Sequence, residues 1–266
     1  MGYITLLPET TKYPITLMGR RAGYCWGADI TDDEKNYKRG LECLRANHGR
    51  VMEYVNIEMV IDEYSARVIR EWYTHIGGMP TRLQGSTRYI NYKNFGYVIP
   101  PKILNNEEAR IIYDNVMSVI SNGLQYLENL GIPREDSAML LPLGMETTEV
   151  DKRNLRNAID MSRQRMCKRA YWEYRDLFKE YCKVLSDYSD EWKYIVDNYM
   201  MPKCEALGYC PEKKSCGRKP LKTEQLKEYE VNIWDILQNN SRQKEYILMK
   251  FSLIIRIDNV ISVKTI

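Results

Sequence analysis

The sequence predicts an α+β fold, because two kinds of hydrophobic pattern occur along its 266 residues. Between 111 and 127, apolar side chains recur at the spacing of an amphipathic helix. Between 55 and 62, apolar and polar side chains alternate one by one, which is the pattern of a half-buried strand. A composition with 44% hydrophobic and 28% charged residues is typical of a globular chain with one sizeable core, or with a core and an appendage.

The N-terminal part is expected to begin with two short strands, over 3–7 and 14–18. A helix then starts at Thr31, because Thr31-Asp-Asp-Glu has the pattern of a capping box. Asn47-His-Gly49 ends this helix. The strand over 55–62 follows.

Ser65 is a good N-cap for the next helix, which delivers residues 70–75 into a loop. Beyond Tyr89 the chain reads as extended, and this stretch ends at Pro101 because proline cannot donate to a strand ladder.

A long helix is predicted next, capped by Asn105 or Asn106 and ended by Gly131. Residues 134–141 read as a short helical turn and 145–150 as a short strand.

The most informative stretch is 70–89, because it gathers most of the candidate anion-binding and proton-handling groups. Gly77-Gly78 lets the backbone take positive φ and approach a ligand closely. Gly85-Ser-Thr-Arg88 offers backbone N–H groups, two hydroxyls and a guanidinium to a phosphate. The alternative is an ordinary corner between a helix and a strand, with solvated arginines.

A second stretch, 151–175, holds eight Lys or Arg residues against three acids. On a helix, Arg156, Asp160 and Arg163 fall along one strip, and apolar side chains line another strip that can be buried. The alternative is a solvated basic face. Asp160 between two arginines favours a structured polar face.

Composition also limits the partners. A formal net charge of +3 is too small to indicate nucleic acid binding by itself. The sequence contains no apolar run of membrane-spanning length and no signal-peptide pattern at its start, so we expect a cytoplasmic protein without a membrane partner. Seven cysteines, an odd number, fit reduced thiols. The spacing of Cys204, Cys210 and Cys216 is unlike that of familiar zinc sites, and no metal is assigned.

Taken together and in this order, these segments resemble the flavin-dependent thymidylate synthases, the ThyX or thymidylate-synthase-complementing family. Four sequence blocks over residues 1–220 carry the resemblance. The first is 48–53, and the second is 70–75 together with 84–89. The third is 135–142 together with 154–156 and 165–175, and the fourth is 208–217. Residues 221–266 lie outside the resemblance and are expected to form a C-terminal extension, polar and helical around 224–238 and β-prone over 246–263. The predicted domains are therefore a catalytic domain, 1–220, and this extension.

The resemblance implies helices packed on an antiparallel-rich sheet, in a homotetramer with active sites at subunit interfaces. It implies FAD as cofactor, dUMP as substrate, and NADPH and methylenetetrahydrofolate as co-substrates in the methylation of dUMP to dTMP. Ser86 and Arg88 would hold the dUMP phosphate. Arg165 would bind the uracil, where a cation stabilises charge that develops on the ring carbonyl.

The matching positions give three sets of candidates. The catalytic candidates are Arg165 and Ser86. The substrate-binding candidates are Glu71, Arg82, Gln84, Gly85, Ser86, Thr87, Arg88 and Arg165. The cofactor-binding candidates are His48, Arg50, Glu53, Thr74, His75, Ile76, Asn154, Arg156 and Asp160.

The chain departs from the family pattern at several of these positions. Thr74-His-Ile76 stands where the family has Arg-His-Arg, Glu71 stands for Gln, and Asp160 stands for Asn or His. Ala138 replaces an arginine expected at the phosphate, and Arg82, in a short insertion before Ser86, is predicted to restore the lost charge. Two other functions therefore stay open: a related flavoenzyme that methylates another pyrimidine nucleotide, and a nucleotide-binding protein without catalysis.

Overall fold

The computed structural model describes residues 2–225. The chain divides into two compact units, 1–206 and 207–266. The segments expected at 224–238 and 246–263 lie almost wholly outside the described residues. The assignment of 1–220 as the catalytic domain stays a prediction.

Unit 1 is built on one antiparallel sheet with strand order β1-β2-β4-β3. The strands are β1 (Tyr3–Leu6), β2 (Asn56–Ser65), β4 (Glu146–Asn154) and β3 (Thr81–Gln84). In β2, Ile57, Met59 and Ile61 are fully buried while their neighbours are partly exposed, as the alternating pattern predicts. The predicted α+β fold is confirmed.

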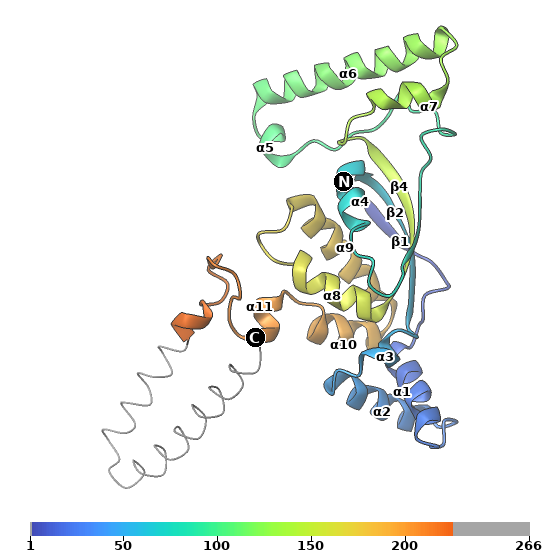
Figure 1. Cartoon of the computed structure of the whole chain (residues 1–266), viewed down its shortest axis with the longest axis vertical. Helices are drawn as coiled ribbons and strands as arrows, with labels where there is room; N and C mark the ends of the chain where they lie inside the picture. The colour runs from blue at the N-terminus through green and yellow to red at the C-terminus, as the bar shows by residue number, and fades with distance from the viewer. Residues whose placement is uncertain (1, 226–266) are drawn as a thin grey trace, which may run out of the picture. The chain divides into compact units, whose positions relative to one another are not determined.

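Helices cover one face of this sheet (Figure 1). They are α4 (Ala66–Trp72), α8 (Leu155–Arg165) and α9 (Trp172–Tyr188), and α10 (Asp190–Tyr199) packs beside α9. Their buried side chains join those of β2 in one core, in which Trp72, Tyr174 and Tyr181 are fully buried aromatic members. The basic stretch 151–175 is thus not a single helix, because it contains the end of β4, all of α8 and the start of α9.

The predicted strand over 14–18 is wrong: it is the first turn of α1 (Pro14–Cys25), with Pro14 at a position where proline favours a helix start. A short apolar run does not by itself distinguish a strand from a buried helix. α1 packs on α2 (Asp33–Arg45) across two glycines, since a Cβ on Gly19 would lie 1.7 Å from the Asn36 carbonyl oxygen and one on Gly40 would lie 1.9 Å from that of Ile15.

Several helix starts agree with the sequence. Ser65 caps α4 by accepting from the Val68 N–H at 3.1 Å, and Asn106 caps α6 (Glu107–Asn129) by accepting from the Ala109 N–H at 3.0 Å. The cap of α2 is Asp32 and not Thr31, because the Asp32 carboxylate accepts from two N–H groups of the first turn.

The structure differs from the sequence prediction at two places near the glycine loops. β3 lies where a loop was expected, and the stretch after Tyr89 forms only one isolated bridge, between Tyr97 and Met145. The remaining elements of unit 1 are short: α3 (Gly49–Met52), α5 (Pro101–Leu104), α7 (Arg134–Ser137) with a 3₁₀ turn (Ala138–Leu140), and α11 (Lys203–Leu207). The helical turn predicted at 134–141 is confirmed.

In the described part of unit 2, residues 207–225, a loop closes through a hydrogen bond from the Cys210 N–H to the Pro220 carbonyl oxygen at 2.7 Å. Cys204, Cys210 and Cys216 are free thiols. Within residues 2–225 no cluster of His, Cys, Asp and Glu side chains is arranged to hold a metal ion. None of the helices described there has the length and apolar character needed to cross a membrane.

Glu149 on β4 gives the first testable prediction. Its side chain is fully buried, and within the described chain neither carboxyl oxygen has a hydrogen-bond partner. Burial, together with the Asp151 carboxylate, raises the pKa of Glu149 to about 8. The folded protein therefore holds a proton that the unfolded chain releases near its ordinary pKa of 4.5, and stability falls as pH rises between these values. Glu149→Gln should remove this contribution to the pH dependence of the unfolding free energy, which is at most about 1.4 kcal/mol per pH unit.

Urea unfolding from pH 5 to 9 measures this slope. Glu108→Gln, at an exposed carboxylate on α6, is the matched control and should keep the wild-type slope. An unchanged slope in Glu149→Gln would show that Glu149 is ionised in the folded protein.

Candidate functional site

The end of α4 holds the guanidinium group of Arg165, the last residue of α8. Arg165 Nε donates to His75 Nε2 at 2.8 Å, Nη1 donates to Glu71 Oε2 at 3.1 Å, and Nη2 lies 3.4 Å from Thr74 Oγ1. Each nitrogen of the guanidinium thus contacts a different side chain of the segment 71–75, which contains the end of α4 and the turn after it. Five N–H groups less these three contacts leaves two that can donate elsewhere.

Tyr174 completes this group of side chains. We call the group the Arg165 cradle (Glu71, Thr74, His75, Arg165 and Tyr174). The Arg165 guanidinium lies 4.7 Å from the centre of the buried Tyr174 ring, against which His75 packs edge-on. Burial, with the charges of Arg165 and Arg153, lowers the pKa of His75 to about 4. The imidazole is therefore neutral at pH 7, so Nε2 can accept while Nδ1 carries the proton.

A second group of predicted residues lines a cavity of about 230 Å³ between α3 and α8, which we call the arginine cavity. Arg50, Arg156 and Asp160 line it, and Arg163 joins them. Arg156 Nη1 donates to Glu53 Oε1 at 2.6 Å, and Arg163 lies 3.5 Å from the Asp160 carboxylate. His48 is the N-cap residue of α3, two residues before Arg50. The polar strip expected on this helix faces a cavity.

Asn154 connects the arginine cavity region to the glycine loop. It caps α8 by accepting from the Asn157 N–H at 2.9 Å, and its Nδ2 lies 3.4 Å from the Gly78 carbonyl oxygen. Gly78 has φ +73°, and a Cβ there would lie 2.2 Å from Asn154 Nδ2. The close approach expected at Gly77-Gly78 is therefore made to Asn154 of the same chain. Ile76 is exposed in this loop.

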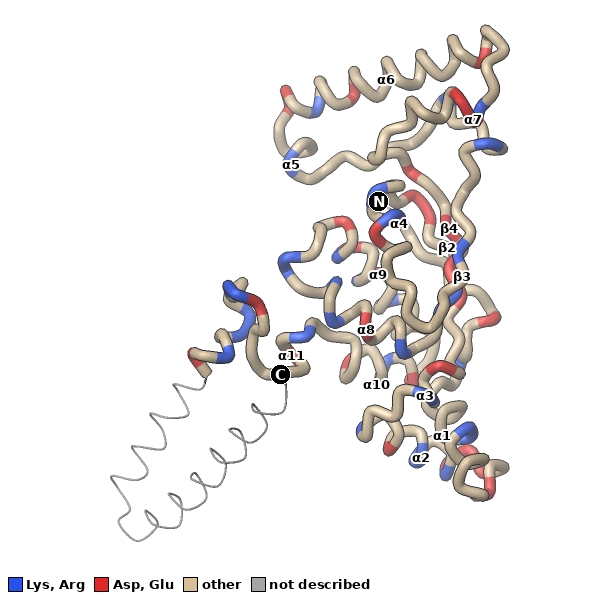
Figure 2. Tube along the Cα trace, viewed as in Figure 1, with Lys and Arg blue, Asp and Glu red and all other residues tan. Residues whose placement is uncertain are grey.

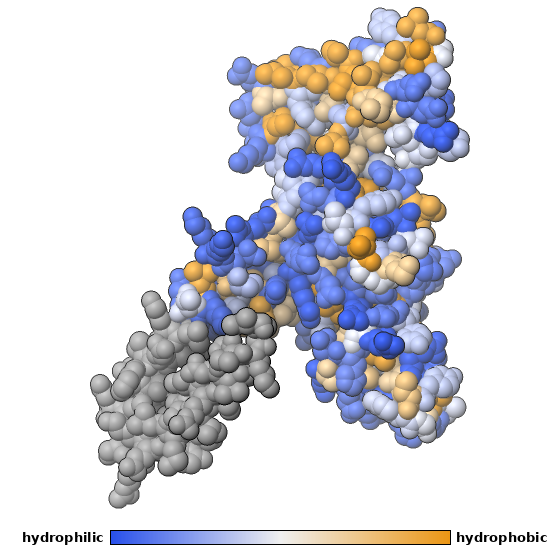
Figure 3. Space-filling view, in the orientation of Figure 1, coloured by the Kyte–Doolittle hydropathy of each residue, from blue (hydrophilic) through white to orange (hydrophobic). Residues whose placement is uncertain are grey.

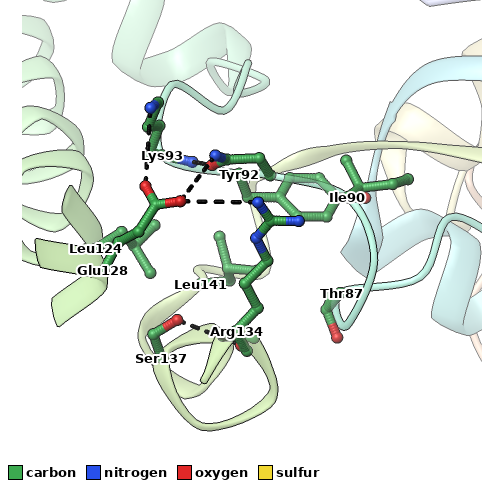
Figure 4. A pocket seen from close by; sticks show the side chains of 11 residues that line it. Thr87, Ile90, Tyr92, Lys93, Leu124, Glu128, Arg134, Ser137 and Leu141 are labelled. Atoms are coloured by element: carbon green, nitrogen blue, oxygen red, sulfur yellow. Dashed lines mark hydrogen bonds and ion pairs between the residues drawn. The ribbon is translucent and has the colours of Figure 1, made fainter. Parts of the chain in front are cut away.

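The third group is the turn 85–89, which follows β3. Gly85 N–H donates to the Thr148 carbonyl oxygen at 2.8 Å, and Gln84 lies 3.5 Å from the Thr147 hydroxyl. The Arg88 N–H donates to Ser86 Oγ at 3.2 Å, and Arg88 Nε lies 2.8 Å from Glu135 Oε2 on α7. Thr87 lines a small pocket beside α7 (Figure 4).

Arg82 is not where the sequence placed it. It lies on β3 and not in a loop, and its guanidinium donates to the Tyr73 carbonyl oxygen at 2.6 Å while it stacks 4.4 Å from the Tyr73 ring. Tyr73 is the C-cap residue of α4, so these two contacts hold the side chain of Arg82 against the end of α4. The expected loop position of Arg82 is therefore wrong, and its role at the phosphate stays a prediction.

One chain therefore carries two separate parts of a site. The Arg165 cradle and the arginine cavity both border α8, whereas the turn 85–89 packs on α7, and Figure 1 shows α7 and α8 well apart. Basic residues follow α8 and the connection after it, and others lie near α7 (Figure 2). Within residues 2–225 no hydrogen bond or ion pair joins the turn 85–89 to the Arg165 cradle.

Sequence reasoning missed several of these residues. Tyr174, Arg134 and Lys93 border the candidate site, yet none stands in a pattern that sets it apart locally. Arg163 was placed on the polar strip with Arg156 and Asp160 by its helical spacing, but it was not among the cofactor-binding candidates.

Comparisons with known proteins show which family the sequence is similar to. Residues 7–188 match the sequence model of a family described as thymidylate synthase complementing protein. The flavin-dependent thymidylate synthase of Nitratidesulfovibrio vulgaris is 26% identical over 214 residues, 74% of this chain and 83% of that protein. The flavin-dependent thymidylate synthase of Clostridium tetani is 28% identical over 247 residues, 82% of this chain and 94% of that protein.

A solved structure shares the fold. It is the flavin-dependent thymidylate synthase ThyX of Helicobacter pylori, complexed with FAD and dUMP, and it matches with a TM-score of 0.60 at 16% sequence identity. The match covers 74% of this chain and 99% of that one. At this identity the likeness concerns the architecture alone.

Proposed function

The chain belongs to the thymidylate synthase complementing protein family, and on this premise we propose that it is a flavin-dependent thymidylate synthase. It converts dUMP to dTMP, with FAD as cofactor and with NADPH and methylenetetrahydrofolate as co-substrates. The observation that carries the proposal is the Arg165 cradle, because it presents a fixed cation with two free N–H groups to a planar, carbonyl-bearing ligand.

Arg165 acts on the pyrimidine ring of dUMP in this proposal. The ring gains negative charge when its carbon attacks the one-carbon unit, and a guanidinium placed at a ring carbonyl stabilises that charge. The cradle fixes the guanidinium before the substrate arrives, so that little reorganisation is needed in the reaction. Glu71 and Thr74 orient the guanidinium, and Ser86 serves at the phosphate end of the substrate.

The arginine cavity fits the diphosphate of FAD. Arg50, Arg156 and Arg163 line it, and guanidinium groups bind phosphate oxygens bidentately without losing their charge. At Gly49 a Cβ would lie 3.0 Å from Arg156 Nε, so the glycine leaves room for this arginine at the wall. When bound, the flavin supplies the hydride that completes the methyl group. The other residues proposed to hold it are His48, Glu53, Thr74, His75, Ile76, Asn154 and Asp160.

Ser86 and Arg88 hold the phosphate of dUMP, in a turn that Gln84, Gly85 and Thr87 help to shape. Because this turn and the Arg165 cradle lie apart in one chain, we propose that a complete site joins them across two copies. A homotetramer is the assembly that the family resemblance implies. The catalytic domain is 1–220, the extension is 221–266, and the protein acts in the cytoplasm.

The outer face of α6 supports self-association and gives a prediction. Ile112, Val116, Val119, Tyr126 and Leu130 are exposed and follow one stripe at the spacing of a helix-packing seam (Figure 3). Val119 is 69% exposed. Val119→Glu would place a charge in this seam, so the particle mass from light scattering should fall from a multiple of the 31.5 kDa chain towards a smaller one.

Gln125→Glu adds the same charge on α6 outside the stripe and is the matched control. Equal masses for wild type and Val119→Glu would show that the assembly does not use this face of α6.

Two experiments test the function. Purified protein should show the visible absorption bands of a flavin, and the gene should support growth of a thymidine auxotroph without thymidine. Protein that binds flavin and methylates another pyrimidine nucleotide, but not dUMP, would establish the altered-substrate alternative. Colourless protein that fails to complement would leave only a nucleotide-binding role.

A further inference from the structure

Two residues of α7 hold the C-terminal end of the turn 85–89. Arg134 Nη1 donates to the Tyr89 carbonyl oxygen at 2.9 Å, and Glu135, the next residue, pairs with Arg88 at 2.8 Å. Within the turn, the Ser86 carbonyl oxygen accepts from the N–H groups of Tyr89 and Ile90. Consequently two arginines, Arg88 and Arg134, are anchored at one short turn that also carries the Ser86 hydroxyl.

The ion pairs around this turn join three cations to two carboxylates. Arg134 and Lys93 share the carboxylate of Glu128, each at 3.7 Å (Figure 4). The third cation, Arg88, pairs with Glu135 at 2.8 Å. Solvent-exposed ion pairs of this kind contribute little to stability, so an anionic ligand can displace the carboxylates.

Arg134 also shares a pocket with Thr87 and Ala138. Arg134 and Ala138 are four residues apart, which places them along one side of the α7 turn and its 3₁₀ continuation. Ala138 has only a methyl group to offer at this wall. The guanidinium of Arg134 is thus the long cationic side chain that reaches the pocket from this segment, as Figure 4 shows.

We propose that Arg134 is a phosphate-binding residue of the nucleotide site and acts beside Arg88 at the turn 85–89. The inference rests on the proposed function and deepens it by naming the group that recognises the phosphate where Ala138 cannot. Two guanidinium groups on one phosphate give four possible charge-assisted hydrogen bonds and bind the dianion strongly. Arg82, which is held over Tyr73, is not needed for this role.

The test compares dUMP with deoxyuridine, which lacks the phosphate, in binding to the flavin-loaded full chain. Arg134→Ala should weaken dUMP binding about ten-fold or more, the loss expected for one charge-assisted hydrogen bond, and should leave competition by deoxyuridine and flavin content unchanged. Arg134→Lys should restore part of the affinity. Arg110→Ala removes a similarly exposed arginine on α6, 3.6 Å from Asp114, and should bind dUMP as wild type does.

Glu128→Gln sharpens the test, because it removes the carboxylate that competes for Arg134. It should tighten dUMP binding in the wild-type background and do so much less in Arg134→Ala. Wild-type affinity for dUMP in Arg134→Ala would overturn the inference, as would an equal loss for deoxyuridine, which would mean that Arg134 only supports the turn through Tyr89. Wild-type protein that binds neither ligand would overturn the proposed function, and this inference with it.

Discussion

Arg165→Ala should lower kcat at least about a hundred-fold, the usual cost of removing a group that stabilises developing charge in a transition state. The segment 71–75 holds Arg165 by all three guanidinium nitrogens, and we propose that Arg165 acts on the base of the nucleotide and not on the flavin. Flavin content should therefore stay near the wild-type value. Initial rates of dTMP formation, normalised to bound flavin from its absorbance, give the measurement.

Two further variants separate charge from geometry. Arg165→Lys keeps the charge but has one nitrogen for three contacts, so we expect it to recover only part of the rate. Arg175→Ala removes an arginine of α9 that belongs to none of the three groups of site residues, and it should turn over like wild type. Near-normal turnover of Arg165→Ala, with flavin bound, would remove Arg165 from the catalytic site.

The parts of the fold that were predictable are those fixed by local contacts. Ser65 and Asn106 cap their helices through side-chain bonds to backbone three residues away, and such bonds leave a pattern in the sequence. The start of α1 has a local signal in Pro14, but its apolar run alone does not distinguish a helix from a strand. It becomes a helix because Gly19 and Gly40 let α1 and α2 pack closely, which is a contact between distant residues.

The site shows the same limit. Arg165 meets His75 across 90 positions of the chain, and only the family resemblance put these residues in one site beforehand. Arg82 was assigned to a loop because β3 is four residues long, too short to display an alternating pattern. Its pairing with β4, which no local signal reveals, places its guanidinium within hydrogen-bond distance of the Tyr73 carbonyl oxygen.

The largest effect on stability is expected at Asp151. Asp151 and Arg153 on β4 are both fully buried, and Arg153 donates to the two Asp151 oxygens from Nε at 2.5 Å and Nη2 at 2.6 Å. The Trp72 indole N–H donates to the same carboxylate at 3.0 Å, and its ring lies 4.3 Å from the guanidinium. Asp151→Asn would leave a buried cation without a counter-charge and should cost about 3–5 kcal/mol of unfolding free energy.

A double-mutant cycle in urea at pH 7 measures how far this loss belongs to the pair. Asp151→Asn combined with Arg153→Met leaves no buried charge, so the double variant should be more stable than the sum of the single changes predicts. Lys152→Met, between the two on the exposed face of β4, removes only an ion pair with Glu58 and should change stability by less than about 1 kcal/mol. Strict additivity in the cycle would mean that the two charges are stabilised independently.

The same variants connect stability to catalysis through α4. Trp72 is the last residue of α4 and lies between Glu71 and Thr74, so the contacts that fix its indole also fix the segment that holds Arg165. Asp151→Asn protein kept folded at low temperature should therefore lose turnover while it keeps its flavin, and the double variant should regain part of that turnover with its stability. If the double variant is stable but as slow as Asp151→Asn, the buried pair positions Arg165 by its charge and not only by packing around Trp72.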